Sequence, residues 1–455
     1  MKSITKRNHY TYGLGTVGRD MTYALISMYL MFYLTDVLEL PNKTLWWVTF
    51  IILMARVFDA LNDPVMGVVV DNTRSRFGKF KPWIAIGALS SGVFTVLLFT
   101  DFGLSGTAFL LLFALIYLLW GISFTANDIS YWSMLPSLTT DQKEREKIGA
   151  FARICANVGL FTVVAGIVPI TTALSDSTGS MEKAYLVFAI MIVAVMWIGQ
   201  SITLFGVKEL DVFKVQPATK LKELVSIIFK NDQLLYTAIA MVLFMIGYIT
   251  TTSFGLYFFK YAYGDEGMYS IFALILGVSQ LVALIVFPLF SKKYNRKQLY
   301  RGATFLVVVG YVIFFFAPMN MLYIGAGGIL IFLGQAFIQL LMLMFLADTI
   351  EYGQWKLGKR NESITFSIQP FINKMGGAVG SGIVGATIIL SGINDAVTPE
   401  DVTTGGLLMM KVAMLLLPLV FILAGYMIYK FKYRIDAKMY AQILSDLKAR
   451  GDISE

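Results

Sequence analysis

The sequence predicts an all-α polytopic membrane protein, and three observations carry that prediction. Hydrophobic residues make up 57% of the 455-residue chain, and charged residues make up only 15%, whereas a soluble domain carries about 25% charged residues. The apolar residues also gather in runs of about 20, the length at which a helix crosses a bilayer. A soluble protein of this size could not bury so much apolar surface and keep a polar exterior.

Twelve apolar segments are long enough to be transmembrane helices, with boundaries uncertain by about 2–4 residues. They cover residues 12–36, 44–70, 82–100, 106–135, 148–175, 183–206, 234–262, 267–290, 301–317, 321–350, 364–393 and 405–430. The loops between them are short, except for one loop after the sixth segment.

That long loop, residues 207–233, is polar and basic and divides the chain in the middle. We therefore predict an N-terminal six-helix half over 1–206, a C-terminal six-helix half over 234–431 and a tail over 432–455. Two six-helix halves joined by a cytoplasmic linker are typical of the major facilitator fold.

The basic residues predict which loops face the cytoplasm. If the N-terminus is inside, 29 of the 37 Lys and Arg residues fall in cytoplasmic segments, three in external loops and five within spans. This bias predicts that both termini are cytoplasmic. We expect the protein to lie in the plasma (inner) membrane. Contact of basic loops with anionic lipid also explains the net charge of +8 without nucleic acid. In the tail, the spacing of Met439, Ile443 and Leu447 predicts a short cytoplasmic helix within residues 435–453.

Cysteine and histidine are too scarce for several kinds of chemistry. Cys155 is the only cysteine and lies in an apolar run, and His9 is the only histidine and lies in the polar N-terminal segment. An intrachain disulfide and a cysteine-based metal site are therefore excluded. Ser-His-Asp catalysis, histidine-ligated metals and haem have no support either. We expect no enzyme and no cofactor, and no repeated filter sequence indicates a channel.

Acidic residues within the spans indicate an ion site. A carboxylate inside a bilayer costs about 2.5–3.5 kcal/mol even on the lenient insertion scale, so an isolated one is informative. Asp59 and Asp63 are four residues apart, on one helical face that Asn62 partly shares. Thr125 and Asp128 on another span could complete a set of oxygen ligands. Such a set suits Na⁺, but desolvated and mutually repelling carboxylates could carry a proton instead.

Residue types that bind sugars lie near these carboxylates. Trp132 is four residues after Asp128, on the same helical face, and the C–H face of a pyranose stacks on an aromatic ring. Sugar hydroxyls need acids, arginine and amides, which the spans supply at Asp20, Asp128, Arg153, Gln369 and Lys374. The simpler alternative is that the acids within the spans only hold helices together by pairing with Arg56, Arg153 and Lys374.

Three strings resemble signature sequences of the glycoside–pentoside–hexuronide:cation symporters, which belong to the major facilitator superfamily. They are ARVFDALNDPVMG at 55–67, RSRFGKFKPW at 74–83, and ADTIEYGQWK at 347–356, which is followed by ESI at 362–364. Their order and spacing match over the whole chain. Within the family, the chain is similar to the melibiose permease and to the transporter part of the lactose and xyloside permeases.

The resemblance implies an alternating-access symporter that couples cation entry to uptake of a glycoside, either a galactoside or a xyloside. In the family, the positions matching Asp59 and Asp63 form the cation site, and those matching Asn62, Thr125 and Asp128 adjoin it. The sugar pocket is lined by the positions that match Arg19, Asp20, Asp128, Trp132, Arg153, Gln339, Gln369 and Lys374. The complete cation pattern favours Na⁺, with Li⁺ or H⁺ as alternatives.

Two departures from the family pattern leave the identity of the glycoside open. Gln339 stands where the melibiose permease has a tryptophan, and Pro370 stands where it has a threonine. Because only about 25 residues follow the last span, we expect no fused regulatory domain; a cytoplasmic phosphotransferase-system regulator is a candidate partner. The competing hypothesis is a transporter of a lysolipid or an organic anion on the same fold. The charged residues at mid-membrane disfavour it.

Overall fold

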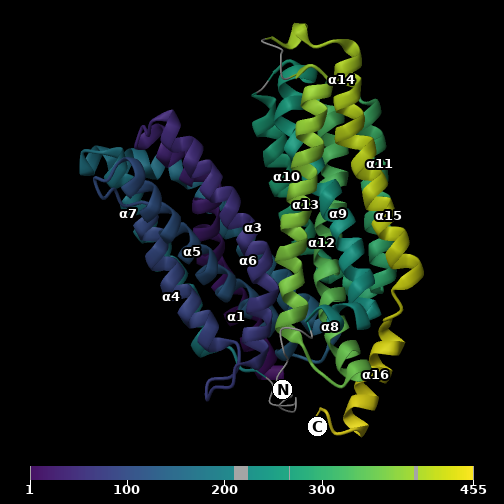
Figure 1. Cartoon of the computed structure of the whole chain (residues 1–455). Coiled ribbons are helices and arrows are strands. Elements are labelled where there is room, and N and C mark those ends of the chain that lie inside the picture. Colours follow the sequence, from purple (N-terminus) through teal and green to yellow (C-terminus); the bar gives the residue numbers. More distant parts are fainter. Residues whose placement is uncertain (1, 210–223, 266, 394–397, 454–455) are drawn as a thin grey trace. The chain divides into compact units, whose positions relative to one another are not determined.

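The computed structural model is almost entirely helical (Figure 1). It describes residues 2–209, 224–265, 267–393 and 398–453, and no strand is assigned among them. By its internal contacts the chain divides into two units. Unit 1 consists of Met1–Leu224 and Asn361–Ser367, and unit 2 consists of Val225–Arg360 and Ile368–Glu455.

Unit 1 contains the first six long helical segments. The first is α1 (Lys2–Ala24), continued by η1 (Leu25–Tyr29), α2 (Leu30–Phe32) and η2 (Tyr33–Val37); then follow α3 (Asn42–Asn72), α4 (Lys81–Leu98), α5 (Gly106–Met134), α6 (Gln142–Thr178) and α7 (Met181–Gly206). Helix α1 packs against both α6 and α7, and α5 packs against both α3 and α4. Helices α1, α3 and α5 carry most of the charged residues predicted for the site, namely Arg19, Asp20, Asp59, Asp63 and Asp128.

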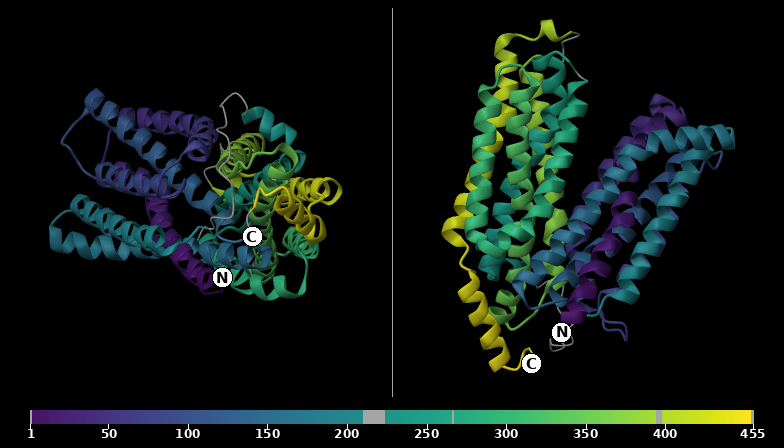
Figure 2. Two further views of the ribbon diagram at one scale, coloured as in Figure 1. Left: turned by 90° about the horizontal axis from the view of Figure 1, so that it is seen from below. Right: turned by 180° about the vertical axis from the view of Figure 1, so that it is seen from behind.

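Unit 2 contains the other six long segments and two short helices. Its elements are α8 (Leu224–Lys230), α9 (Asp232–Tyr257) with η5 (Phe258–Tyr263), α10 (Met268–Lys293), α11 (Arg296–Phe316), α12 (Met321–Leu357), α13 (Glu362–Leu390), η7 (Pro399–Asp401), α14 (Thr404–Lys411), η8 (Val412–Leu416), α15 (Leu417–Lys432) and α16 (Ala437–Ala449). Helix α12 packs against α9, α10 and α11 and is the most buried of the apolar helices. It therefore forms the core of unit 2 (Figure 2).

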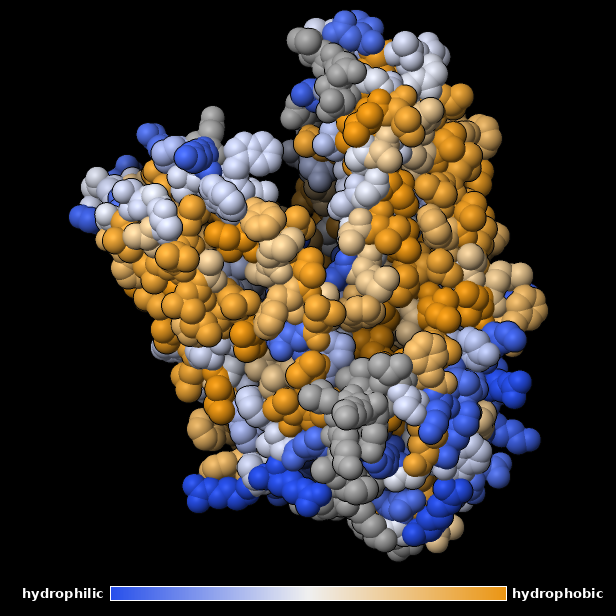
Figure 3. Space-filling model, viewed as in Figure 1, coloured by the Kyte–Doolittle hydropathy of each residue, from blue (hydrophilic) through white to orange (hydrophobic). Residues whose placement is uncertain are grey.

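Ten helices among the described residues are long and apolar enough to cross a membrane. The other two predicted spans are the first segment, which π-helical turns interrupt, and α13, where Asn373 and Lys374 lower the hydropathy. In Figure 3, hydrophobic side chains cover the middle of the helices and hydrophilic side chains gather at their ends. The predicted twelve-helix fold is confirmed. Residues 210–223 of the predicted 207–233 loop lie outside the described residues, so the limits of that loop remain a prediction.

Several helices extend beyond the apolar segments that predict them. Helix α6 begins at Gln142 rather than near residue 148, because the Asp141 side chain accepts hydrogen bonds from the first free backbone amides. Helix α12 continues to Leu357 and ends at Gly358, which has a φ of 69°. Hydropathy locates the part of a helix that lies in the membrane, whereas caps set where the helix itself ends.

A charged cluster explains why the first residues of α13 belong to unit 1. The carboxylate of Asp71, at the end of α3, accepts hydrogen bonds from the backbone amides of Ser363 (3.0 Å) and Ile364 (2.9 Å). These are amides that an isolated helix start leaves unpaired. Lys79 joins the cluster at 3.1 Å from Asp71 and 2.5 Å from Glu362. Burial lowers the pKa of Lys79, but the two carboxylates outweigh it and raise that pKa above its ordinary value.

The predicted tail helix is confirmed as α16. It buries one face, formed by Tyr440, Ile443 and Leu447. Trp355, in the last turn of α12, donates a hydrogen bond to the carboxylate of Asp446 (2.9 Å). The helix starts at Asp436, whose side chain accepts a hydrogen bond from the amide of Met439 (2.9 Å).

Loss of the Asp436 cap should destabilise α16 locally. An N-cap contributes about 1 kcal/mol, so we expect Asp436→Ala to speed amide hydrogen exchange in α16 about fivefold. The amide of Met439 and the charge of Lys297 hold the pKa of Asp436 below its ordinary value. The cap should therefore act above about pH 4 and weaken as the pH falls through the lowered pKa. Ser445→Ala on the exposed face of α16 is the matched control and should leave exchange unchanged.

Candidate functional site

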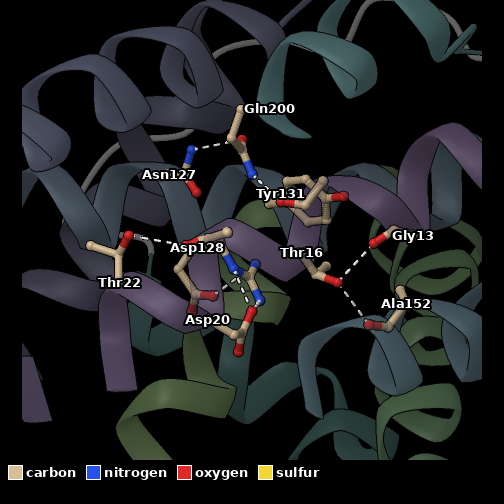
Figure 4. Close-up of polar contacts among 12 residues, drawn as sticks. Gly13, Thr16, Asp20, Thr22, Asn127, Asp128, Tyr131, Ala152 and Gln200 are labelled. Atoms are coloured by element: carbon tan, nitrogen blue, oxygen red, sulfur yellow. Dashed lines mark hydrogen bonds and ion pairs between the residues drawn. The ribbon is translucent and has the colours of Figure 1, made fainter. Parts of the chain in front are cut away.

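A buried arginine joins two carboxylates in the middle of unit 1. The Arg19 side chain on α1 is only 2% exposed, and its guanidinium lies 2.8 Å from Asp20 Oδ2 and 3.1 Å from Asp128 Oδ1. Both carboxylates are 25% exposed. Figure 4 shows Asp20 and Asp128 with these ion pairs. The cluster therefore carries two negative charges and one positive charge, and its acids remain accessible while its base does not.

Aromatic rings and a second arginine complete this cluster. The Arg19 guanidinium lies 5.0 Å from the ring centre of Tyr131 and 5.2 Å from that of Trp132. The Arg153 guanidinium on α6 lies 4.4 Å from the Trp132 ring. The Trp132 side chain is buried and both cations contact its ring. The sugar-stacking role of Trp132 remains a prediction. It requires the Arg153 guanidinium to move away from the face of the Trp132 ring.

A network of buried amides fixes the helices that carry the charges. Asn127, next to Asp128 on α5, donates hydrogen bonds to the carbonyl of Ile84 (2.8 Å) and to the side chain of Gln200 (3.1 Å). Gln200 on α7 donates to the carbonyl of Gly15 on α1 (2.7 Å). Four helices of unit 1, α1, α4, α5 and α7, are thereby tied at one level, as part of Figure 4 shows. This network holds Asp128 in register with Arg19.

The second predicted cluster is formed between α3 and α5. Asp63 is 1% exposed, and its carboxylate accepts a hydrogen bond from the Thr125 hydroxyl at 3.3 Å. One helical turn away, Gly121 faces the Asp59 carboxylate so closely that a Cβ on residue 121 would lie 2.8 Å from Oδ1. Each carboxylate of α3 therefore contacts one residue of α5: Asp63 contacts Thr125, and Asp59 lies against Gly121. The two pairs lie one helical turn apart on their helices.

These residues fit a small cation better than a transition metal. No group of three or more His, Cys, Asp or Glu that could hold a metal ion is found in the described part of the chain. The amide nitrogen of Asn62 is buried without a hydrogen-bond partner in that part. Rotation of this amide would place its oxygen there instead. Together with Asp59, Asp63 and Thr125, it would supply only oxygen ligands, which suit alkali cations.

Unit 2 holds the remaining predicted residues. Gln339 lies on α12, and Gln369 and Lys374 lie on α13; all three are half-buried. The Gln339 side chain lies near the hydroxyl of Tyr248 on α9, and that hydroxyl accepts a hydrogen bond from Gln280 on α10 at 3.0 Å. Most of the charged residues predicted for the site therefore lie in unit 1, whereas unit 2 contains mainly the predicted amide side chains.

The sequence reasoning missed several residues that these contacts involve. Tyr131 follows Asp128 by three residues, so helical spacing could have identified it. Asn127 and Gln200 are neutral and fully internal, and nothing in the sequence separates them from ordinary packing residues. Tyr23 lies within electrostatic range of Asp20, Asp59 and Asp128, but tyrosine is frequent throughout the chain.

The chain matches a known protein family over most of its length. Residues 11–437 match the family described as MFS/sugar transport protein. The chain belongs to this family. It is 32% identical over 453 residues to the raffinose carrier protein of Pediococcus pentosaceus, covering 96% of the chain and 70% of that protein. It is 32% identical over 451 residues to the lactose permease of Lactobacillus delbrueckii subsp. bulgaricus, covering 97% of the chain and 72% of that protein.

Solved structures show the same fold for this member of the MFS/sugar transport family. The E. coli fucose:proton symporter aligns with a TM-score of 0.68 at 12% identity, over 95% of this chain and 98% of that one. At such low identity the likeness concerns the fold alone. The resemblance to the glycoside–pentoside–hexuronide:cation symporters is confirmed through the family and the relatives above.

Removal of Arg19 should destabilise the protein more than removal of the whole cluster. Arg19→Met leaves Asp20 and Asp128 without their bridging cation, a loss that costs about 3–5 kcal/mol for a buried pair. We expect a clear fall in the melting temperature of the purified protein in detergent, measured by thermal unfolding. Adding Asp20→Asn and Asp128→Asn should recover most of it.

Lys147→Met provides the matched control for that experiment. Lys147 pairs with Glu144, and both side chains are 35% exposed, so the pair contributes about 0–1 kcal/mol. An equal fall in melting temperature for Arg19→Met and Lys147→Met would contradict the buried-cluster interpretation.

Proposed function

We propose that the protein is a secondary active symporter that couples inward movement of a monovalent cation, with Na⁺ favoured over Li⁺ or H⁺, to uptake of a glycoside. One observation carries this proposal. On α5, Thr125 contacts Asp63 in one cluster, and three residues later Asp128 contacts Arg19 in the other. A single helix thereby joins an oxygen-rich carboxylate site to a site rich in sugar-binding residue types.

The shared helix offers a physical route for coupling. A cation between Asp59 and Asp63 would neutralise repulsion and draw Thr125 toward it, which fixes the position of α5. Asp128 would then be held ready for a sugar hydroxyl. By linkage, a sugar that binds better in the presence of the cation must strengthen cation binding by the same factor.

The proposed sugar contacts follow from the chemistry of each group. Asp20 and Asp128 accept hydrogen bonds from hydroxyl pairs, whereas Arg19 and Arg153 donate to hydroxyl oxygens. Trp132 offers an apolar ring, and Gln369, Lys374 and Gln339 supply further polar groups. The names of the raffinose carrier and the lactose permease support a galactoside ahead of a xyloside, because both of those sugars contain a galactosyl unit.

The proposed setting is the plasma membrane, with both termini in the cytoplasm. The support is the gathering of basic residues in loops on one side. A cytoplasmic phosphotransferase-system regulator remains a candidate partner of those loops. A lysolipid or organic-anion carrier is the rival function, and it would not need the accessible acids Asp20 and Asp128.

A thermal-shift screen tests the proposal directly. We expect lactose, raffinose or melibiose to raise the melting temperature of the purified protein, and to do so more in Na⁺ than in choline at the same pH. A ligand at 100 times its Kd stabilises by about 2.7 kcal/mol. If no galactoside, xyloside, glucoside or glucuronide shifts the melting temperature, the sugar assignment is wrong. Equal shifts in Na⁺, Li⁺ and choline would rule out alkali-cation coupling.

A methyl group at position 121 should damage the cation site selectively. In Gly121→Ala the new Cβ would lie 2.8 Å from the Asp59 carboxylate, which must move away. We expect Na⁺ affinity, measured by Na⁺-dependent thermal shift, to fall by about 10-fold, or about 1.4 kcal/mol. Gly302→Ala on α11 is the matched control, because a Cβ there meets nothing within 4 Å. Similar Na⁺ affinity in both variants would contradict the placement of the cation at Asp59.

A further inference from the structure

Three neutral polar side chains meet in the middle of unit 2. Tyr248 on α9 accepts a hydrogen bond from Gln280 on α10 at 3.0 Å, and the side chain of Gln339 on α12 lies near the same hydroxyl. The Phe244 ring stacks on Tyr248, with ring centres 6.3 Å apart, which restricts the orientation of the phenol. All three members of this trio, Tyr248, Gln280 and Gln339, are half-buried. Each therefore keeps some surface open to a ligand.

The open surface of Gln280 in this trio does not face lipid. On α10 the exposed side chains form one stripe, and Gln280 lies on the opposite face of the helix. The members of that stripe are Ile271, Leu274, Val278, Val282, Ile285 and Leu289, which are 44–65% exposed. The neighbours of Gln280 on its own face, Phe287 and Ala283, are buried. A half-buried amide on the inner face of a membrane helix requires polar surroundings, which a water-filled cavity provides.

A second polar trio in the same unit shows what purely structural hydrogen bonding looks like. Thr251 lies 2.6 Å from the hydroxyl of Tyr311, which also accepts a hydrogen bond from Gln335 at 3.3 Å. These three side chains are at most 1% exposed. They already join α9 and α12 through α11, so the connection of α9 to α12 does not depend on the open trio.

The two trios are in register along their helices. Thr251 follows Tyr248 by three residues on α9, and Gln335 precedes Gln339 by four on α12, so each pair lies one turn apart on one face. The internal trio thus fixes the two helices whose next turns carry the open trio. This arrangement presents a preorganised set of donors and acceptors, which is typical of a binding site.

We propose that Tyr248, Gln280 and Gln339 form a saccharide-binding subsite on unit 2, and this inference rests on the proposed sugar transport. Two amides and a phenol offer both donors and acceptors but no charge, a combination that matches the neighbouring hydroxyls of an uncharged glycosyl unit. Tyr248 and Gln280 are then sugar-binding residues in addition to the predicted Gln339.

The test compares variants of the two trios. Tyr248→Phe and Gln280→Leu should each weaken lactose and raffinose binding by about 10-fold or more, measured by calorimetry on the purified full chain in saturating Na⁺. Their melting temperatures and their Na⁺ affinities without sugar should stay close to those of the wild type. Tyr311→Phe in the internal trio is the matched control and should lower the melting temperature while leaving the dissociation constants for the sugars unchanged.

Three results would overturn the inference. Sugar affinities within twofold of wild type for both Tyr248→Phe and Gln280→Leu would show that the trio does not contact sugar. A lower melting temperature with unchanged sugar affinity would show that the trio only joins helices. If the wild-type protein itself binds neither lactose nor raffinose nor any other saccharide of the screen, the proposed function fails first, and the subsite fails with it.

Discussion

A guanidinium inside an apolar helical bundle must have negative partners, and the structure of unit 1 depends on this constraint. Arg19 meets it with Asp20 beside it and with Asp128 from α5. The need for Asp128 at that level fixes how α5 lies against α1. The amides of Asn127 and Gln200 then hold the same register without any charge, so the register does not rest on the ion pairs alone.

Helix α5 connects the two clusters because two of its turns face one cluster and the next two turns face the other. Gly121 and Thr125 face the carboxylates of α3, whereas Asp128 and Trp132 face Arg19 and Arg153. Gly121 has to be small and Thr125 has to donate, since each meets a carboxylate directly. A displacement of α5 at one cluster therefore also moves the residues of α5 at the other cluster. This shared movement is the physical basis for coupling two ligands.

The sequence predicts the fold and marks the charged residues that the structure brings into contact, whereas it does not mark their neutral partners. Twelve apolar runs predict the helices because the bilayer imposes a length, and the cost of a charge in a bilayer draws attention to Asp59, Asp63 and Asp128. No such cost marks Gln200 or Gln280, because an amide in a span is unremarkable until its partner is known. The π-helical turns of the first segment and the close approach of Gly121 to Asp59 are properties of packing between helices, which a linear pattern does not contain.

The distribution of charge has a consequence for transport. The ion pairs of Arg19 with Asp20 and Asp128, and the contact of Thr125 with Asp63, all lie within unit 1. A motion of unit 1 against unit 2 therefore need not break them, and a buried charge left without its partner would cost about 3–5 kcal/mol. Neutral hydrogen bonds such as those of Tyr248 are cheaper to exchange, at about 0.5–1.5 kcal/mol each. The neutral groups of unit 2 can therefore exchange contacts with a substrate in every cycle at a lower cost than breaking the ion pairs of Arg19.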